Sequence, residues 1–245
     1  MNVALDIGNT KVKLALFDDE LIFVKSFLLN DMKNELKLIF NLYPKIKNLI
    51  VCSVIDFKFN YEQFDFKNIH ILSVNSKLPF VNYYCEDTLG NDRIALVSSA
   101  SIKYPHENVL IIDVGTCITY DFINNENQYT GGAISPGLNM RLRSLNKFTG
   151  KLPLIKLKEI DNFNGLNTKD SINIGVLKGV IFEIQGFINK YSSDNQNLTV
   201  ILTGGNSKFL SKQLKISIFA NQNFLVEGLN ELIKLNIKNW KNILL

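Results

Sequence analysis

Two short polar motifs of the same kind follow apolar runs of the chain. Residues 6–10, Asp-Ile-Gly-Asn-Thr, end a run at 2–5, and residues 113–116, Asp-Val-Gly-Thr, end a second run at 109–112. In a tight turn of this composition, backbone N–H groups can face phosphate oxygens and the carboxylate can orient a hydrated cation. Lys13 would add positive charge near a phosphate. A single copy is more often an ordinary hairpin turn, but two copies in matching contexts favour a pair of phosphate-binding turns.

A third glycine element follows the apolar run at 198–203. Thr203, Gly204 and Gly205 form a turn in front of a predicted helix, and glycines there would let the backbone approach a base or a ribose closely. Alone, such a turn is more often a plain connection between a strand and a helix. It therefore gains weight only beside the two Asp-containing turns.

The segment before the second Asp-containing turn places an acidic and a basic residue side by side. Gly90 and Asn91 make a tight turn, and Asp92 and Arg93 open a predicted helix. A carboxylate at a helix amino terminus is favoured in its charged form, and it can accept the proton of a hydroxyl that attacks a phosphoryl group. Arg93 could hold a substrate carboxylate through its planar fork. The alternative is a helix-capping Asp92 beside an arginine that faces the solvent.

Each Asp-containing turn lies in the same order of elements: strand, turn, strand, turn, strand and then helix. Alternating apolar and polar residues predict strands, and apolar spacing near 3.6 predicts helices. The predicted strands are 2–5, 12–17, 21–29, 48–54, 70–74, 109–112, 117–122, 128–135 and 198–203, and the predicted helices are 31–43, 92–103, 136–148, 168–191 and 224–240. The repeat predicts an α/β protein of two related lobes, 1–105 and 106–245, each with a mixed five-stranded sheet.

Composition narrows the class of protein. The 245 residues include 27 Lys and Arg against 23 Asp and Glu, and this small, scattered excess predicts no nucleic-acid surface. No run of 18 uncharged apolar residues occurs, so no membrane-spanning helix and no membrane partner are expected. Cys52, Cys85 and Cys117 form no CxxC pair and are expected to be buried or idle thiols in a reducing cytosol. With only two histidines, a His-rich zinc site is not expected.

Together the three turns resemble the nucleotide site of the actin, sugar kinase and Hsp70 superfamily. Over nearly the whole chain, the motifs resemble those of type III pantothenate kinase. They are DIGNTxxK at 6–13, LGxDR at 89–93, DxGT at 113–116, GGxIxPG at 131–137, NTxxSIxxG at 167–175 and TGG at 203–205. The GxDR element in front of DxGT is specific to this family within the superfamily. Glu86, Cys117 and Ser171 depart from the family's usual proline, alanine and alanine, but none of them carries an assigned role in the chemistry.

The resemblance implies two ribonuclease H-like (actin-like ATPase) lobes with ATP between them. It also implies ATP-dependent phosphorylation of the primary hydroxyl of pantothenate to 4'-phosphopantothenate, the first step of coenzyme A biosynthesis. Asp92 would be the catalytic base in a pantothenate-binding turn made of Gly90, Asn91, Asp92 and Arg93. The residues implied in ATP binding are Asp6, Ile7, Gly8, Asn9, Thr10, Lys11, Val12, Lys13 and Thr116.

The resemblance further implies a cation, a second subunit and a cellular location. Asp113 would ligate the monovalent cation, K⁺ or NH₄⁺, that this family requires, and Mg²⁺ would arrive with ATP. Tyr83 would contact pantothenate, and Thr168 would reach it from the partner subunit of a homodimer. A cytoplasmic enzyme is expected.

Two alternatives stay open at the level of sequence. The first is another kinase or phosphohydrolase of the superfamily, such as a sugar kinase or an exopolyphosphatase. The second is a non-catalytic accessory regulator of transcription, a role that has also been described for proteins of this family. A binder without catalysis should have lost Asp92 or the phosphate-binding turns, yet all of them are present.

Overall fold

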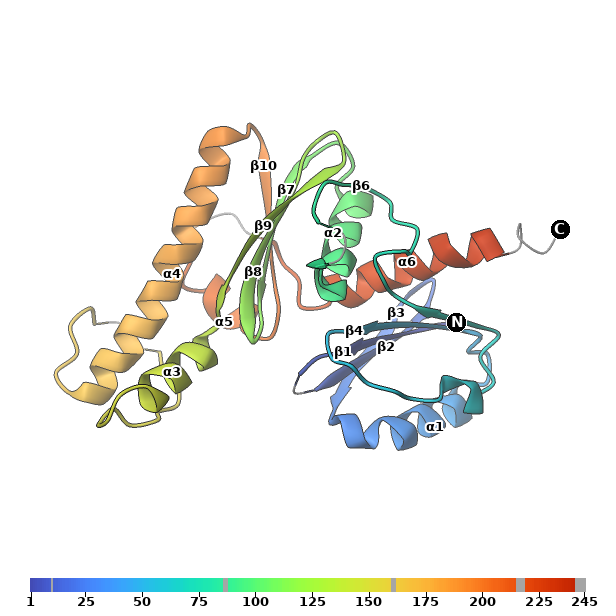
Figure 1. The fold of residues 1–245 in the computed structure, drawn as a ribbon, viewed down its shortest axis with the longest axis horizontal. Coiled ribbons are helices and arrows are strands. Elements are labelled where there is room, and N and C mark those ends of the chain that lie inside the picture. The colour runs from blue at the N-terminus through green and yellow to red at the C-terminus, as the bar shows by residue number, and fades with distance from the viewer. Residues whose placement is uncertain (10, 86–87, 160–161, 215–218, 241–245) are drawn as a thin grey trace. The chain divides into compact units, whose positions relative to one another are not determined.

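The computed structural model describes residues 1–9, 11–85, 88–159, 162–214 and 219–240 (Figure 1). The chain forms two compact units. The first comprises Met1–His106, Ile123–Thr130 and Asn223–Leu245, and the second comprises Glu107–Phe122 and Gly131–Gln222. The first boundary therefore lies one residue from the predicted one. The predicted second lobe, however, gives up its last helix and one short hairpin to the first unit.

The first unit is built on a five-stranded mixed sheet with the order β3-β2-β1-β4-β5. Its strands are β1 (Asn2–Ile7), β2 (Val12–Asp18), β3 (Glu20–Phe27), β4 (Asn48–Ser53) and β5 (Asn68–Ile71). The pairs β1–β2 and β2–β3 are antiparallel, whereas β1–β4 and β4–β5 are parallel. The central strand β1 is buried over most of its length, which is why it reads as a continuous apolar run.

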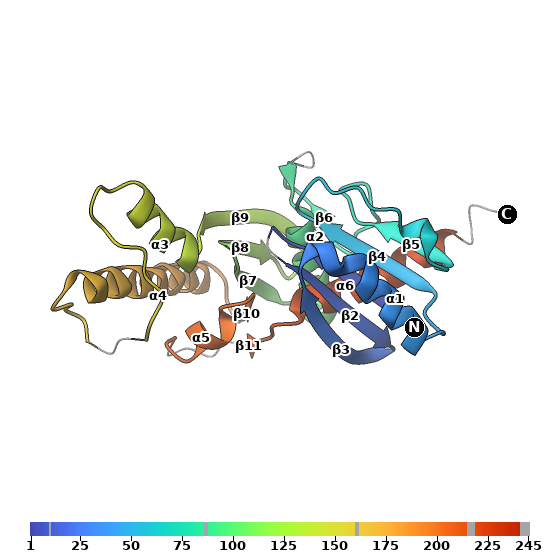
Figure 2. The ribbon, with the colours of Figure 1, turned by 90° about the horizontal axis from the view of Figure 1, so that it is seen from below.

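Helices cover both faces of this sheet (Figures 1 and 2). α1 (Met32–Leu42) buries Met32, Leu36 and Ile39 at helical spacing against the apolar residues of β1, β2 and β4. α6 (Phe224–Trp240) contacts β1 and β4 and packs on α2 (Asn91–Lys103). The last helix of the chain thus completes the core of the first unit.

The second sheet repeats the strand order of the first. Its strands are β7 (Asn108–Val114), β8 (Cys117–Ile123), β9 (Gln128–Pro136), β10 (Leu198–Thr203) and β11 (Phe219–Ala220), with β6 (Val81–Asn82) as a sixth strand. The order β9-β8-β7-β10-β11 matches β3-β2-β1-β4-β5 element by element. Five strands were predicted, and the sixth arises because β6 pairs in parallel with the first residues of β9, which belong to the first unit.

Among the residues of the second unit that the structure describes, three helices accompany this sheet: α3 (Leu138–Lys147), α4 (Thr168–Asp194) and α5 (Ser207–Ser211). α4 begins at an N-cap, Asn167, whose side chain accepts a hydrogen bond of 3.0 Å from the Asp170 N–H. Its apolar stripe, which includes Val176, Val180 and Ile184, packs on the strands in the core of the unit.

α4 is also long and apolar enough to cross a membrane by length and composition alone. The absence of an uncharged run of 18 residues therefore does not exclude such a segment by this wider criterion. A core helix meets the same criterion, and the buried stripe of α4 is part of the core of the second unit.

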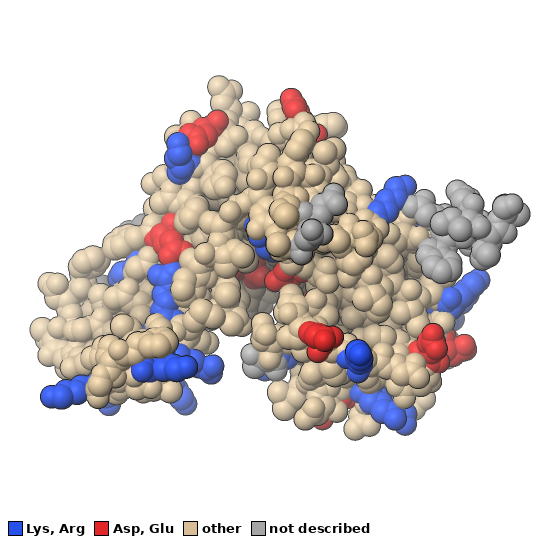
Figure 3. All heavy atoms as spheres, viewed as in Figure 1, with Lys and Arg blue, Asp and Glu red and all other residues tan. Residues whose placement is uncertain are grey.

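Basic side chains gather along one stretch of the second unit. Residues 138–158 contain no Asp or Glu, and the exposed basic residues there are Arg143, Lys147, Lys151, Lys156 and Lys158. Basic side chains also show on the face of the molecule in Figure 3, near α3. The positive charge is therefore less scattered than the composition suggested.

Candidate active site

The first Asp-containing turn is a hairpin between β1 and β2. Asp6 pairs with Lys13 across the hairpin, and the Gly8 N–H donates a hydrogen bond of 3.1 Å to the Lys11 carbonyl, which closes the turn. Ile7 and Val12 are buried below it, and Asn9 and Lys11 are exposed at its tip. Thr10, for which ATP binding was predicted, lies outside the described residues.

Asp6 is an electrostatically costly residue. It keeps some contact with solvent, but protein atoms crowd its carboxyl group. Burial raises the pKa of Asp6 to about 6; Lys13 opposes this shift, and the negative charge of Asp92 adds to it. The two carboxylates are thus close enough to repel each other. Oxygen ligands of this kind suit Mg²⁺, and a cation placed here would relieve the repulsion.

The fold brings Asp92 to this position through the start of α2. Gly90 is the N-cap residue and Asn91 begins the helix, so Asp92 is in the first turn and is not the cap that the alternative assumed. The Asn91 amide donates a hydrogen bond of 3.2 Å to the Ser53 carbonyl at the end of β4. A Cβ atom on Gly90 would lie 2.6 Å from Asp92 Oδ1. Glycine therefore leaves room for the carboxylate.

Arg93 lies in an aromatic setting that sequence reasoning missed. Only 4% of the residue is exposed, so the solvent-facing alternative is wrong. Its guanidinium carbon lies 5.0 Å from the centre of the Tyr84 ring and 6.0 Å from that of Tyr129. Tyr83, by contrast, is 65% exposed, and its N–H donates to the Tyr129 carbonyl. A contact between Arg93 or Tyr83 and a substrate stays a prediction.

In the second unit, the second Asp-containing turn meets the Gly-Gly turn. Asp113 on β7 pairs with Thr203 on β10, so both turns leave the same edge of the sheet. Gly204 has a φ of +89°, and a Cβ atom on it would lie 2.2 Å from Asp113 Oδ1. The Asn206 N–H donates to the Val114 carbonyl at 3.2 Å. Backbone thus cradles the Asp113 carboxylate where a side chain would clash.

The Pro-Gly pair of the GGxIxPG motif reaches the same turn. The Gly137 N–H donates a hydrogen bond of 3.1 Å to the Thr116 carbonyl. A Cβ atom on Gly137 would lie 2.5 Å from the carbonyl oxygens of Gly115 and Thr116. Three motifs that are distant in sequence therefore converge inside the second unit, with Thr116 exposed at the turn. Among the described residues, no group of three or more His, Cys, Asp or Glu side chains could hold a metal ion.

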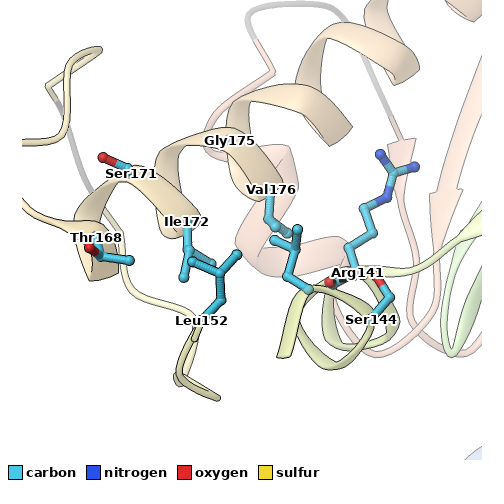
Figure 4. A pocket seen from close by; sticks show the side chains of 9 residues that line it. Arg141, Ser144, Leu152, Thr168, Ser171, Ile172, Gly175 and Val176 are labelled. Carbon is cyan, nitrogen blue, oxygen red and sulfur yellow. Dashed lines mark hydrogen bonds between the residues drawn. The ribbon is translucent and has the colours of Figure 1, made fainter. Parts of the chain in front are cut away.

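Thr168 lies apart from these turns. It is the first residue of α4 and lines a pocket of about 520 Å³ between α3, α4 and the segment around Leu152 (Figure 4). Thr168 and Ser171 are at one end of the residues drawn, and the Arg141 guanidinium points away at the other end. None of the other predicted site residues lines this pocket.

The three cysteines differ in accessibility. Cys52 on β4 is fully buried, Cys117 is partly exposed and Cys85 is exposed. Burial raises the pKa of the Cys52 thiol, and the charges of Asp6 and Asp92 raise it further. Cys52 is therefore a neutral packing residue beneath the carboxylate pair.

Solved structures with the same fold include a Baf family protein from Campylobacter jejuni, a candidate transcriptional activator. It aligns with a TM-score of 0.63 and 22% identity over 96% of this chain and 99% of the other. An activator of 2-hydroxyisocaproyl-CoA dehydratase from Clostridium difficile aligns with a TM-score of 0.54 and 9% identity, over 98% of this chain and 96% of the other. At these identities the likeness concerns the fold, and it confirms the predicted actin-like architecture.

Sequence relatives are much closer. A type III pantothenate kinase from Flavobacterium johnsoniae is 40% identical over 98% of this chain and 100% of the relative. One from Christiangramia forsetii is 44% identical over 96% of this chain and 99% of the relative. The model of the type III pantothenate kinase family matches residues 2–190. Since the family model matches residues 2–190 and the relatives match nearly the whole length, the chain belongs to the type III pantothenate kinase family.

Proposed function

We propose that this protein transfers the γ-phosphoryl group of ATP to the primary hydroxyl of pantothenate, which yields 4'-phosphopantothenate and ADP and opens coenzyme A biosynthesis. Family membership supplies the reaction. The observation that carries the assignment to this chain is the pair of carboxylates that lie close enough to repel each other, Asp6 at the end of a strand and Asp92 at the start of a helix.

In the first unit, the hairpin at residues 6–13 binds the phosphates of ATP. Its backbone N–H groups and Lys13 supply positive charge, and the Asp6 carboxylate orients the Mg²⁺ that arrives with the nucleotide. Asp92 accepts the proton of the pantothenate hydroxyl as the oxygen attacks the γ-phosphorus. The bond from that phosphorus to the bridging oxygen breaks, and ADP leaves.

The turn at residues 90–93 binds pantothenate, with Tyr83 beside it. Arg93 pairs with the substrate carboxylate through its fork. The contacts of its guanidinium with Tyr84 and Tyr129 support this role because they hold the group in one orientation before substrate arrives. The exposed Tyr83 ring is available to a ligand.

In the second unit, Asp113 ligates the monovalent cation and Thr116 contacts ATP. The close approach of the Gly204 backbone to the Asp113 carboxylate supports this assignment because it holds the carboxylate oxygens, the ligands that such a cation would need, in one place. The cation would add positive charge beside the transferred phosphoryl group.

A homodimer completes the proposal. The exposed large apolar side chains of the second unit include Phe148, Leu154, Phe163, Leu166 and Phe182. On α4, Phe182 shares one helical stripe with Gly175, Gly179 and Gly186, and a Cβ on any of these glycines would meet nothing within 4 Å. A second copy packed on this stripe would bury it, and it would bring Thr168 to the partner's pantothenate. The dimer acts in the cytoplasm, with neither nucleic acid nor membrane as a partner.

Asp92→Asn tests the central assignment. We expect kcat for ADP release with pantothenate to fall by about 10²–10⁴-fold, the usual contribution of a general base, while ATP binding by calorimetry is retained. The exposed Asp65→Asn is the matched control in the same unit. Full turnover of folded Asp92→Asn would refute the base assignment. Absence of pantothenate-dependent turnover in the wild type, with ATP still bound, would favour a regulatory protein.

A further inference from the structure

A partly buried hydrogen-bond network in the second unit has no role in the proposed chemistry. Its centre is Glu183 on α4. Glu183 Oε1 accepts hydrogen bonds from the Tyr120 hydroxyl of β8, at 2.8 Å, and from the Ser135 hydroxyl of β9, and Glu183 Oε2 accepts from Arg141 Nη2 of α3. One carboxylate therefore joins two strands and two helices.

Arg141 carries this network onward to the chain that leads into α3. Its Nε donates a hydrogen bond of 2.7 Å to the Pro136 carbonyl, and its Nη2 also lies 3.4 Å from Ser135 Oγ. The planar guanidinium thus bridges Glu183 and the backbone immediately before Gly137. A lysine at this position would carry a single ammonium group on a flexible side chain, and it could not hold Glu183 and the Pro136 carbonyl at once in one fixed plane.

Gly137 is the residue that touches the second Asp-containing turn. Its N–H is bonded to the Thr116 carbonyl, and its missing side chain lets the Gly115 and Thr116 carbonyls approach. The position of the turn therefore depends on where Pro136 and Gly137 lie. Arg141 fixes that position from outside the turn.

We infer that Arg141 and Glu183 are positioning residues for the turn at residues 113–116, and that they hold it in the geometry that binds ATP and the monovalent cation. This inference rests on the proposed role of that turn. The two side chains reach this turn through Ser135, Pro136 and Gly137.

The charges in the network are matched. Burial alone would raise the pKa of Glu183, but hydrogen bonds from Ser135, Arg141 and Tyr120 outweigh it and lower that pKa overall. Tyr120 stays a neutral donor because burial and the bond to Glu183 raise its pKa. The Arg141 and Glu183 side chains are only 23% and 22% exposed. The pair is therefore less screened by solvent than Lys190 and Asp194 on the same helix, which are 73% and 50% exposed.

Three variants of the full-length enzyme separate positioning from mere stability. Arg141→Met removes all contacts, Arg141→Lys keeps a charge for Glu183 but not the bridge to Pro136, and Glu183→Gln keeps an acceptor without charge. Lys190→Met is the control for loss of a surface ion pair on α4. The measurements are KM for ATP, KM for pantothenate, the K⁺ concentration for half-maximal activity and the thermal midpoint.

We expect Arg141→Met and Glu183→Gln to raise KM for ATP and the half-activating K⁺ concentration by about tenfold or more, the fold-change that the loss of a hydrogen bond to a charged group causes. KM for pantothenate should stay within about twofold. Arg141→Lys should restore the thermal midpoint of the wild type but leave KM for ATP and the half-activating K⁺ concentration raised. A purely structural ion pair would instead be rescued by lysine in every measurement, which would overturn the inference.

Two further outcomes also overturn it: no change in either constant, or a rise confined to KM for pantothenate. The second outcome would give Arg141, which lines the same pocket as Thr168, a role in binding pantothenate instead. Asp113→Asn in the same assays distinguishes the proposed role of the turn from the proposed positioning role of Arg141 and Glu183. If Asp113→Asn leaves K⁺ activation unchanged, the proposed role of the turn is wrong. If it abolishes K⁺ activation while the Arg141 variants behave as the wild type, only the positioning inference fails.

Discussion

Asp6 and Lys13 face each other across a hairpin, yet the burial of the Asp6 carboxyl still raises its pKa. A chain selected only for stability would place an apolar residue here, since a crowded carboxylate next to a second one destabilises the folded state. Groups in such an environment cluster at functional sites. Asp6 is thus best explained by what the hairpin binds.

This gives a pH-dependent prediction for Asp6→Asn without nucleotide or Mg²⁺. The pKa of Asp6 is about 6 in the folded chain against 3.8 as the ordinary value. Between these values the folded state holds a proton that the unfolded state has released, so stability falls as pH rises through this window. Above pH 6, we expect the variant to unfold about 2–4 °C higher than the wild type, the shift that roughly 1 kcal/mol causes at this length.

Thermal unfolding of both proteins between pH 4 and pH 8 checks this. The gap between the two midpoints should shrink towards pH 4, where Asp6 is protonated in the folded wild type. Parallel curves across the whole range would contradict it. The same titration predicts that ATP binding to the wild type weakens below about pH 6, because a protonated Asp6 cannot orient Mg²⁺.

At the residue scale, the sequence singled out residues by type and by position at the ends of elements, and their roles stay predictions. Asp92 and Asp6 were chosen for their types and their places at the ends of elements, and the fold brings the two together. Tyr84 and Tyr129 around Arg93 were missed. No spacing along the chain links Tyr129 to Arg93, because their proximity depends on the pairing of β6 with β9.

Among the elements, α2 matters most because its first turn carries Asp92. The distance between α2 and α6 depends on Gly228 of α6. A Cβ atom on Gly228 would lie 2.3 Å from the Ala95 carbonyl and 2.9 Å from Ser99 Cβ, both on α2. Helices approach this closely only over a residue without a side chain. Gly228 therefore fixes the distance of α2 from the last helix of the chain.

Gly228→Ala should push α2 away from α6 and destabilise the first unit by about 1–3 kcal/mol, the usual cost of overpacking. It should also lower kcat, because Asp92 moves with the helix. Gly150→Ala is the control, since a Cβ there meets nothing within 4 Å. Urea unfolding and steady-state turnover measure both effects. Equal stability of the two variants would show that the helices can separate at no cost.

The periodicity of the sequence predicted the long elements well but the shortest ones not at all. The strands and helices around both Asp-containing turns were found because alternation and 3.6-residue spacing extend over enough residues to be distinctive. β6 and β11 have two residues each. Such strands are defined by their hydrogen-bond partners and carry no pattern of their own, so the sixth strand of the second sheet was missed.

At the scale of the whole molecule, the compact units do not follow the order of the chain, because the first unit also contains the last helix. The repeat predicted two consecutive lobes, but α6 packs on β1, β4 and α2 at the other end of the sequence. Its apolar spacing showed that it would be a buried helix and could not show against which sheet. Assigning a helix to a core requires knowing which faces are still uncovered.

The homodimer can be tested by mixing two inactive variants. If Thr168 serves the partner's site, a dimer of one Asp92→Asn subunit and one Thr168→Glu subunit contains one site with both native residues. Mixed and re-equilibrated variants should therefore recover up to about a quarter of wild-type activity, because half of the dimers are mixed and each has one intact site. If both residues serve the same subunit, the mixture stays inactive. Phe182→Asp is the control, because it should yield monomers and prevent recovery.

Because the three thiols differ in accessibility, a chemical label can be placed close in sequence to the turn at residues 90–93. Cys52 is sealed and protonated beneath Asp6 and Asp92, whereas Cys85 is exposed next to Tyr84, on the segment that leads into Gly90. A maleimide dye added to the native protein at neutral pH should react first at Cys85. The enzyme thus carries a natural attachment point for a fluorescent reporter of substrate arrival, with no engineered cysteine.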